Sequence, residues 1–346
     1  MLTSGKPTLI ASLGKLGIEE TELDIVAIDP TNGNVSKLYT LPSLYGLFDD
    51  VWVCLQVDSE RERIYVLVTP ARVDKGNYLY ELSLADGHIL KNYTLEPFLG
   101  MEEIYTQWDF NPDIRTLYGL CLNYTTTSLT WNYVWCSVKF DENGVGKTQH
   151  GFYAGTDEDP PGPGPCRRVS MNRNTFSTGE YWYTETNDIF VRSVNTQTGE
   201  PDELIWTVED KALIAYDPPT FDALVTGKTN EYAIVMRPGE MDIHSFHSIV
   251  VKLKSGGDEE LIAKLPTDLV ESPGPRWAYD PNTDMLYVLM RTDFKLIYDT
   301  LVMVNLSQPN SVRTIPAPIK SLYDPGMYFV NDMHLIEWPP TTHANP

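Results

Sequence analysis

The chain has 346 residues, of which 48 are Asp or Glu and 26 are Lys or Arg, so its formal net charge is −22. A surface this acidic repels phosphate backbones and anionic lipid heads, so neither nucleic acid nor an acidic membrane surface is an expected partner. No apolar run approaches the roughly 18 residues that a membrane-spanning helix needs. With 42% hydrophobic residues, the composition indicates a globular chain.

One unit recurs along the sequence: a β-rich run that ends in a small turn. The turns lie 53 to 58 residues apart, at Gly33, Gly87, Gly144, Gly199, Gly257 and Asn310. An apolar run precedes each unit and a shorter one follows it, and Val, Ile, Tyr, Thr and Trp dominate these runs. Each period therefore predicts a four-stranded antiparallel meander, and radial repetition of such sheets gives a β-propeller.

The periods predict an all-β chain, a six-bladed β-propeller that forms one domain over residues 1–346. The expected blades are residues 50–97, 103–153, 166–208, 219–266 and 275–318, with a closing blade made of 324–338 plus 7–42. The run PTLIASL (7–13) matches a second strand that has no first strand before it, so the N- and C-terminal strands are expected to share that blade. Two stacked sandwiches are the alternative, but they do not explain the equal spacing.

Second strands are expected at runs such as RIYVLV (63–68), EYWYTET (180–186) and MLYVLMR (285–291). In each first strand, alternate side chains are expected to face the channel and the neighbouring sheets. Leu55 and Phe110 belong to the apolar phase that is expected to pack between blades. Gln56 and Ala278 belong to the mixed phase that is expected to line a wet channel.

Long, uneven loops are expected over the end of the ring where the first strands begin, and such loops are where sites tend to be built. Charged residues at this end are the candidate catalytic groups: Asp50, Glu103, Arg168 and Arg276. Aromatic and polar residues are the candidate ligand-binding groups: Trp52, Tyr105, Gln107, His244, Phe246, His247 and Phe294.

No organic cofactor and no metal are expected, with calcium as the alternative. Asp50 and Glu103 occupy equivalent places in adjacent blades, where two carboxylates repel each other or share a cation or an arginine. His244 and His247 lack a third zinc ligand nearby. The two Gly-Lys-Thr strings lack the earlier glycine of a phosphate-binding loop.

The compartment is left open by the sequence. Glycosylation sequons at Asn34, Asn92, Asn123 and Asn305 favour the secretory pathway, whereas the first 20 residues show no signal-peptide core. Cys121 and Cys136 fall on neighbouring strands of an expected hairpin, so a cross-strand disulfide stands beside free thiols as an alternative. The oligomeric state is not indicated.

The strings YDPNTDMLYVL and AIDPTNG are typical propeller blade turns. In architecture the chain resembles the gluconolactonase/senescence-marker family and strictosidine-synthase-like proteins. The first resemblance implies a channel calcium, for which Glu103, Asp50 and Asn172 are the matching residues, although the family's N-terminal Glu-Gly-Pro motif is missing. A similarity to fungal biosynthetic propellers implies cofactor-free cyclisation or cycloaddition.

These observations predict a cofactor-independent enzyme that acts on a small, partly apolar molecule at the channel mouth, as a cyclase or a lactonase-like hydrolase of secondary metabolism. Trp52 and Tyr105 would stack on this ligand. Arg168 and Arg276 would bind carbonyl or oxyanion charge, and Glu103 or Asp50 would act as base. The alternative is a non-catalytic propeller that binds a protein or glycan partner.

Overall fold

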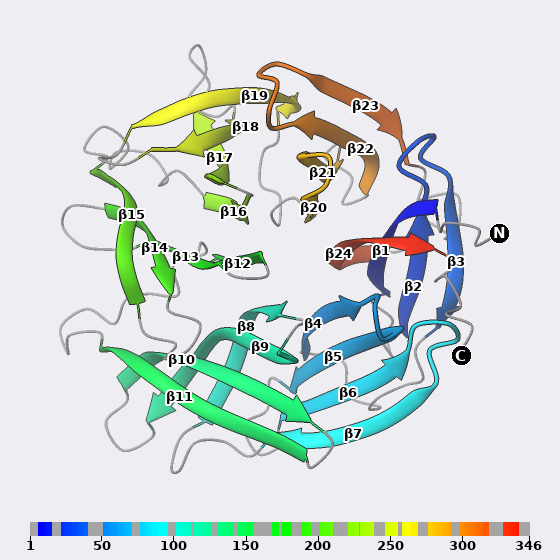
Figure 1. Cartoon of the computed structure of the whole chain (residues 1–346), viewed down its shortest axis with the longest axis vertical. Coiled ribbons are helices and arrows are strands. Elements are labelled where there is room, and N and C mark those ends of the chain that lie inside the picture. The colour runs from blue at the N-terminus through cyan, green and yellow to red at the C-terminus, as the bar shows by residue number, and fades with distance from the viewer. Residues whose placement is uncertain are drawn as a thin grey trace.

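The structure is a computed structural model that describes nineteen segments of the chain: residues 6–15, 22–40, 51–70, 77–95, 102–111, 114–125, 130–141, 144–154, 168–172, 175–181, 188–194, 201–209, 221–227, 229–238, 246–254, 258–268, 276–291, 298–317 and 328–338. Within these segments the strands form six four-stranded antiparallel sheets. Figure 1 shows them arranged around a common axis, each with one strand at the centre. The prediction of an all-β propeller is confirmed.

Three sheets lie between residues 51 and 209, and in each of them the strands are hydrogen-bonded in the order in which they occur in the sequence. Sheet 1 consists of β4 (Val51–Asp58), β5 (Arg63–Pro70), β6 (Asn77–Ser83) and β7 (Ile89–Leu95). Sheet 2 consists of β8 (Glu102–Asn111), β9 (Thr116–Thr125), β10 (Thr130–Asp141) and β11 (Gly144–Ala154). Sheet 3 consists of β12 (Arg168–Asn172), β13 (Thr175–Tyr181), β14 (Asp188–Val194) and β15 (Pro201–Glu209).

The remaining sheets complete the arrangement. Sheet 4 consists of β16 (Phe221–Thr226), β17 (Glu231–Pro238), β18 (Phe246–Leu253) and β19 (Glu259–Asp268). Sheet 5 consists of β20 (Arg276–Asp280), β21 (Met285–Arg291), β22 (Tyr298–Asn305) and β23 (Val312–Pro316). The closing sheet joins the two ends of the chain, in the order β24 (Tyr328–Trp338), β1 (Lys6–Lys15), β2 (Glu22–Ile28) and β3 (Val35–Thr40).

The closing sheet pairs β24 antiparallel with β1 from Lys6 opposite Trp338 to Lys15 opposite Tyr328. The pairing agrees with the expectation that the C-terminal strand would lie inside the N-terminal ones. Along the axis, β24 contacts β20 on one side and β4 on the other. Sheet 5, the closing sheet and sheet 1 are therefore consecutive around the ring.

The repeated turns have a repeated backbone geometry. Between the third and fourth strands, the predicted turn residues Gly33, Gly87 and Asn310 have φ values of 75°, 72° and 64°. This left-handed conformation favours Gly and, after it, Asn, which explains why those residue types mark the period.

A second repeat lies between the first and second strands, where the last turn residue of three sheets also has a positive φ. Its carbonyl accepts a hydrogen bond, at 3.0 to 3.1 Å, from the N–H of a buried residue that follows or ends the third strand. The donor and acceptor pairs are Leu84 with Glu62, Phe140 with Arg115, and Leu306 with Asp284.

The core lies between neighbouring sheets, and successive residues of one strand enter different parts of it. In β21, Leu286, Val288 and Met290 pack towards sheet 4, whereas Tyr287 and Leu289 pack towards the closing sheet. Sheet 5 is therefore covered on both faces, and the channel is bounded by the edge of the innermost strand.

This arrangement corrects the expected orientation of the first strands. Leu55 and Phe110 pack between sheets as predicted. Gln56 and Ala278 do not line a wet channel, because they are only 6% and 5% exposed and Ala278 belongs to the core beside the closing sheet. The two phases of a first strand face its two neighbouring sheets.

Two smaller expectations are also revised. The second strand of sheet 3 is Thr175–Tyr181 rather than 180–186, because Asn172 pairs with Thr175 across a short connection. Cys121 lies opposite Val134 and Cys136 opposite Gly119, so the cysteines are diagonal rather than directly opposed. Diagonal positions are about 7–8 Å apart, which disfavours a disulfide between them.

Candidate functional site

The innermost strands carry most of the candidate residues from the sequence. Four strands of four different sheets contribute them: Trp52 on β4; Glu103, Tyr105 and Gln107 on β8; Arg168 on β12; and Arg276 on β20. Asp50, His244 and Phe294 lie outside the described residues, so the proposed pairing of Asp50 with Glu103 is untested.

Four of these residues lie near the starts of their strands but at different depths: Arg276 is four residues before the end of β20, Trp52 six before the end of β4 and Glu103 eight before the end of β8. Arg168 and Arg276 are the first residues of β12 and β20, and Trp52 and Glu103 are the second residues of β4 and β8. The innermost strands of a propeller run in one direction along the channel, so their first residues lie at the same end. These backbone positions therefore lie towards the same end of the channel, at different depths along it.

Phe246 and His247 begin β18, the third strand of sheet 4. Third strands run parallel to first strands, so both residues belong to the same end of the ring. They are two strands away from the axis, a distance of about 10 Å. In register, His247 lies opposite Arg237 on one side and Asp268 on the other. They belong to the rim of the mouth rather than to the channel edge.

A register shift interrupts β8 between Tyr105 and Gln107, which pair with Cys121 and Leu120 respectively. The uniform two-residue alternation expected from Glu103 through Gln107 therefore stops at this bulge. Such bulges bend a strand and change the side to which the following residues turn. Gln107 is not in phase with Tyr105, contrary to the expectation.

The channel edge also includes two aromatic residues that the sequence analysis did not single out, Trp277 and Tyr279. On β20, Arg276, Trp277 and Tyr279 are half-buried, whereas the neighbouring strand β21 is fully buried from Leu286 to Met290. Trp277 and Tyr279 also pack against the core between sheets 4 and 5. Their position in a first strand could have indicated a place at the channel edge. The sequence analysis missed it because it expected only the alternate positions, such as Ala278, to face the channel.

His334 on β24 is a further residue of the channel edge, and sequence reasoning missed it. Its half-buried ring places Nε2 2.6 Å from the carbonyl oxygen of Leu55 on β4. Burial lowers the pKa of His334 to about 4, although the hydrogen bond to Leu55 acts in the opposite direction. A carbonyl only accepts, so the neutral ring donates from Nε2 and keeps an unprotonated Nδ1.

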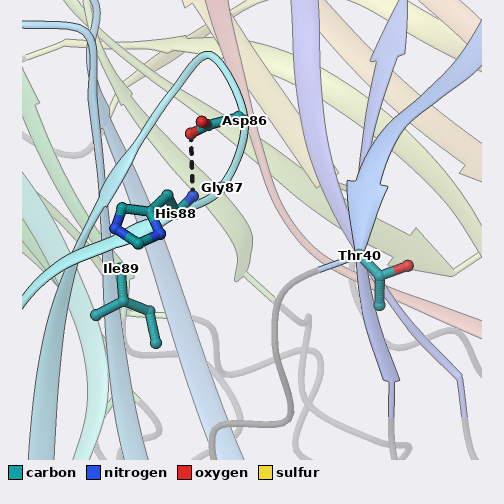
Figure 2. A pocket seen from close by; sticks show the side chains of 5 residues that line it. All are labelled: Thr40, Asp86, Gly87, His88 and Ile89. Atoms are coloured by element: carbon teal, nitrogen blue, oxygen red, sulfur yellow. Dashed lines mark hydrogen bonds between the residues drawn. The ribbon is translucent and has the colours of Figure 1, made fainter.

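An open hollow lies away from the channel, where the closing sheet meets sheet 1 (Figure 2). Its volume is about 560 Å³, and its lining residues are Thr40, Asp86, Gly87, His88 and Ile89. The backbone N–H of His88 donates to Asp86 Oδ1 at 3.1 Å, and Thr40 Oγ1 donates to Asp24 at 2.6 Å. Its polar groups thus stabilise a turn and a strand pair.

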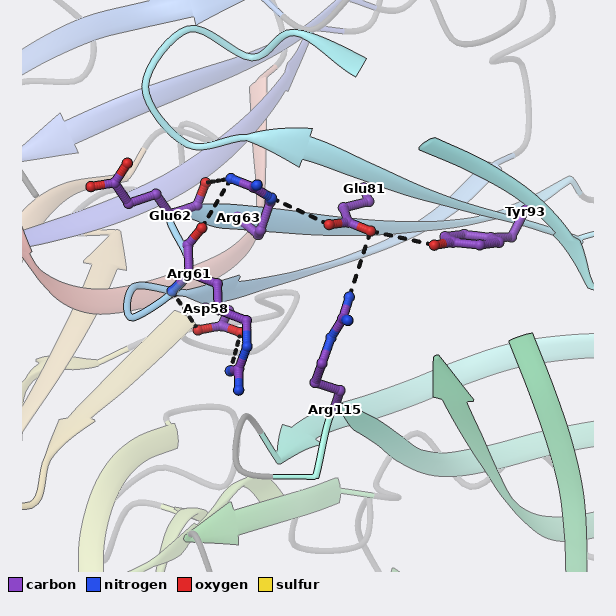
Figure 3. Close-up of polar contacts among 7 residues, drawn as sticks. All are labelled: Asp58, Arg61, Glu62, Arg63, Glu81, Tyr93 and Arg115. Atoms are coloured by element: carbon purple, nitrogen blue, oxygen red, sulfur yellow. Dashed lines mark hydrogen bonds and ion pairs between the residues drawn. The ribbon is translucent and has the colours of Figure 1, made fainter. Parts of the chain in front are cut away.

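A polar network joins sheets 1 and 2 around the buried carboxylate of Glu81 (Figure 3). Arg63 Nε lies 3.2 Å from Glu81 Oε1, and an Arg115 guanidinium nitrogen lies 3.7 Å from Oε2. The Tyr93 hydroxyl also donates to Oε2 at 3.4 Å. The opposite charges satisfy each other, which indicates a structural role for the network.

Arg115 reaches this network from the turn between β8 and β9, with its guanidinium 5.2 Å from the centre of the Phe140 ring. Tyr65 Oη and Arg115 Nε are buried and make no well-directed hydrogen bond among the described residues. Burial raises the pKa of Tyr65 to about 12, and the nearby guanidinium partly offsets that rise.

Among the described residues no group of three or more His, Cys, Asp or Glu side chains is placed to hold a metal ion. No helix in the described part of the chain is long and apolar enough to cross a membrane.

No protein-family model matches the chain, and no curated protein sequence matches it. Among solved structures, it is similar to a puromycin-hydrolyzing peptidase of Mycobacterium tuberculosis, with 12% identity and a TM-score of 0.44 over 93% of this chain and 53% of that one. The chain therefore spans about half the length of that peptidase.

Two propellers of other kinds show comparable similarity. The β-propeller domain of the Trilobed protease from Pyrococcus furiosus has 9% identity and a TM-score of 0.45, over 79% of this chain and 73% of that one. The six-bladed fucose-recognising lectin of Aleuria aurantia has 9% identity and a TM-score of 0.46, over 92% and 97%. At this level of similarity the comparisons assign no activity, and the fold rests on the strand pairing above.

Proposed function

We propose that the six sheets form one six-bladed ring and that the protein acts on a small, partly apolar molecule at the end of its channel, without an organic cofactor. One observation carries this proposal: Trp52, Glu103, Arg168 and Arg276 all occupy the first or second position of an innermost strand. In this proposal, four separate sheets would contribute an aromatic residue, a carboxylate and two cations to one opening.

The residue types suit a ligand with an apolar body and a carbonyl or carboxylate group. Trp52 and Tyr105 offer stacking surface, and Arg168 and Arg276 offer donors to an oxyanion. Glu103 supplies a base for proton abstraction or for activating water. A cyclisation or cycloaddition, or a lactonase-like hydrolysis, uses this set of groups.

The proposal is tested by native mass spectrometry of the purified protein, followed by substitution of the site. A bound molecule of a few hundred daltons is expected, and Arg276→Ala should reduce its occupancy at least tenfold. Lys264→Ala removes a cation from an exposed position of β19 and should leave occupancy unchanged. Equal loss in both variants would contradict a site at the channel mouth.

Turnover of the identified ligand then separates an enzyme from a binding protein. Under the enzyme proposal, Arg168→Ala and Arg276→Ala should each lower turnover by about 10²-fold, because a lost oxyanion donor costs about 2.7–4 kcal/mol. Binding without any turnover would instead support the non-catalytic alternative.

A separate experiment tests for bound calcium, because bound calcium would favour a lactonase-like site over a metal-free one. A cation held by Asp50 and Glu103 would stabilise the folded protein through binding linkage. We expect melting temperatures with and without a chelator to agree. A reversible drop with chelator, restored by excess calcium, would replace the metal-free proposal.

A further inference from the structure

The closing sheet meets sheet 1 along a seam where one strand comes from the C-terminal end of the chain. Strand β24 is the innermost strand of the closing sheet, so β1 is its only partner within that sheet. Its other contacts reach across to β20 and β4. What holds β24 to β4 therefore contributes to closing the ring.

His334 makes a direct polar contact across this seam. The imidazole Nε2 lies 2.6 Å from Leu55 O, between residues 279 positions apart in the chain. The surroundings are apolar: Leu55, Ile10 and Ile336 belong to one buried cluster, and Ile10 is the register partner of His334 on β1.

We propose that the His334–Leu55 contact is a proton-sensitive closure of the ring, which holds β24 against β4 while the imidazole is neutral. Protonation destabilises the seam, because the ring would then carry a charge among apolar side chains even though Nε2 still donates to Leu55 O. The neutral ring donates from Nε2 to a carbonyl and leaves no charge in the apolar seam. A protonated ring would place a positive charge beside Ile10, Leu55 and Ile336, and burial of such a charge is costly unless a carboxylate neutralises it.

Charged residues occur on each of the strands around His334; on β24 itself they are Asp332 and Glu337. On β4, the Asp58 carboxylate accepts from the Arg61 guanidinium at 2.9 Å. On β1, Lys6 pairs with Asp29, and Lys15 is at the other end of the strand. The charged residues at the ends of the remaining neighbour, β20, are Arg276 and Asp280.

The direction of the pH effect follows from the lowered pKa of His334, about 4 against an ordinary value of 6.5. The unfolded chain binds the proton more readily than the folded one. The stabilising contribution is therefore complete above pH 6.5 and is lost as the pH falls towards and through 4.

Thermal melts of His334→Gln against the unaltered protein test the proposal, since glutamine keeps a donor for Leu55 but does not titrate in this range. We expect the unaltered protein to melt about 5 °C higher at pH 7.5, and this advantage to shrink as the pH falls below 6.5 and to be lost as it falls through 4. His88→Gln, in an exposed turn, should show the same pH dependence as the unaltered protein. Parallel curves for all three proteins would overturn the proposal.

Hydrogen exchange of the unaltered protein provides the second measurement, which remains available if His334→Gln does not fold. After correction for intrinsic rates, protection of the β24 amides should fall at least tenfold between pH 6.5 and 4.5, while the fully buried strand β21 should retain its protection. Equal changes in β24 and β21 would show that acid acts on the whole fold, and the proposal would be wrong.

Discussion

The two seams on either side of sheet 1 are built differently, although one strand serves both. Ile64 and Val66 of β5 pack towards the closing sheet, in a cluster of mainly aliphatic residues with Leu55. Tyr65 and Leu67, the alternate residues, pack towards sheet 2. Alternation along a single strand thus supplies two unrelated interfaces.

The second seam is aromatic and charged. Tyr65 lies 4.5 Å from Phe140 and 5.0 Å from Phe110, measured between ring centres. Beside these rings, Arg115 of sheet 2 pairs with Glu81 of sheet 1. Among the described residues, the first seam has two polar contacts from a side chain to a backbone carbonyl, His334 to Leu55 O and Tyr39 to Leu84 O, whereas the second has an ion-pair network, so the two should respond differently to substitution.

The largest expected effect concerns the first seam and comes from deletion of residues 324–346. The shortened chain would lose β24, with the buried side chains of Met333 and Ile336 and the whole pairing to β1. At about 25 cal/mol per Å² of apolar surface, such a loss costs several kcal/mol, a large part of the stability of a domain. Circular dichroism and light scattering should show loss of cooperative melting and aggregation.

A peptide of residues 328–338 added to the shortened chain should restore cooperative melting, if the missing strand alone is responsible. A shortened chain that melts within a few degrees of the intact one would show that β24 does not close the ring.

The stability cost of replacing a turn glycine by alanine should depend on which atoms the added Cβ would contact. A Cβ on Gly33 would lie 1.9 Å from the backbone carbonyl oxygen of Pro316, and one on Gly87 would lie 2.5 Å from the Tyr39 ring. Both residues have a positive φ, but a ring moves more readily than backbone. Denaturant unfolding should show a cost of about 3 kcal/mol for Gly33→Ala and about 1–2 kcal/mol for Gly87→Ala.

Gly146→Ala is the matched control for these turns. Its Cβ would meet only the Lys139 carbonyl oxygen, at 3.9 Å. A change within about 0.5 kcal/mol is expected. A cost for Gly146→Ala as large as that for Gly33→Ala would contradict the assignment of strain to the turns.

The charged seam is tested by Glu81→Gln, which keeps the shape of the side chain and removes its charge. Arg63 and Arg115 would lose their anionic partner. Removing one member of a fully buried pair costs about 3–5 kcal/mol, and the partial exposure of both arginines reduces the expected value to about 2 kcal/mol. Chemical denaturation measures it, and a neutral result would show that the network does not stabilise this seam.

The smallest effect is expected for Tyr65→Phe, since the buried hydroxyl makes no well-directed hydrogen bond among the described residues. Stability should change by less than about 0.5 kcal/mol. Tyr39→Phe, by comparison, removes a 3.1 Å hydrogen bond to Leu84 O and should cost about 1 kcal/mol. A larger stability cost for Tyr65→Phe than for Tyr39→Phe would indicate that the Tyr65 hydroxyl has a hydrogen-bond partner in the second seam.

Much of the fold was predictable because it depends on local chemistry. Gly33, Gly87 and Asn310 occupy left-handed turn positions, so at three of the six periods the residue type reflects a local backbone requirement. The runs at 63–68 and 285–291 became β5 and β21 with nearly the same bounds. The candidate site was predictable only as a set of strand positions, since Trp52 and Arg276 could be placed at strand starts but not given partners.

Apolar and polar alternation along β4 and β20 by itself determined that these segments are strands with two distinct faces. Only the tertiary structure decided what covers each face, because a two-residue period is the same whether the second face meets water or another sheet. For this reason Gln56 and Ala278 are buried where a wet channel was expected. The contact of His334 with Leu55 likewise depends on ring closure, which brings together residues 279 positions apart that no local pattern relates.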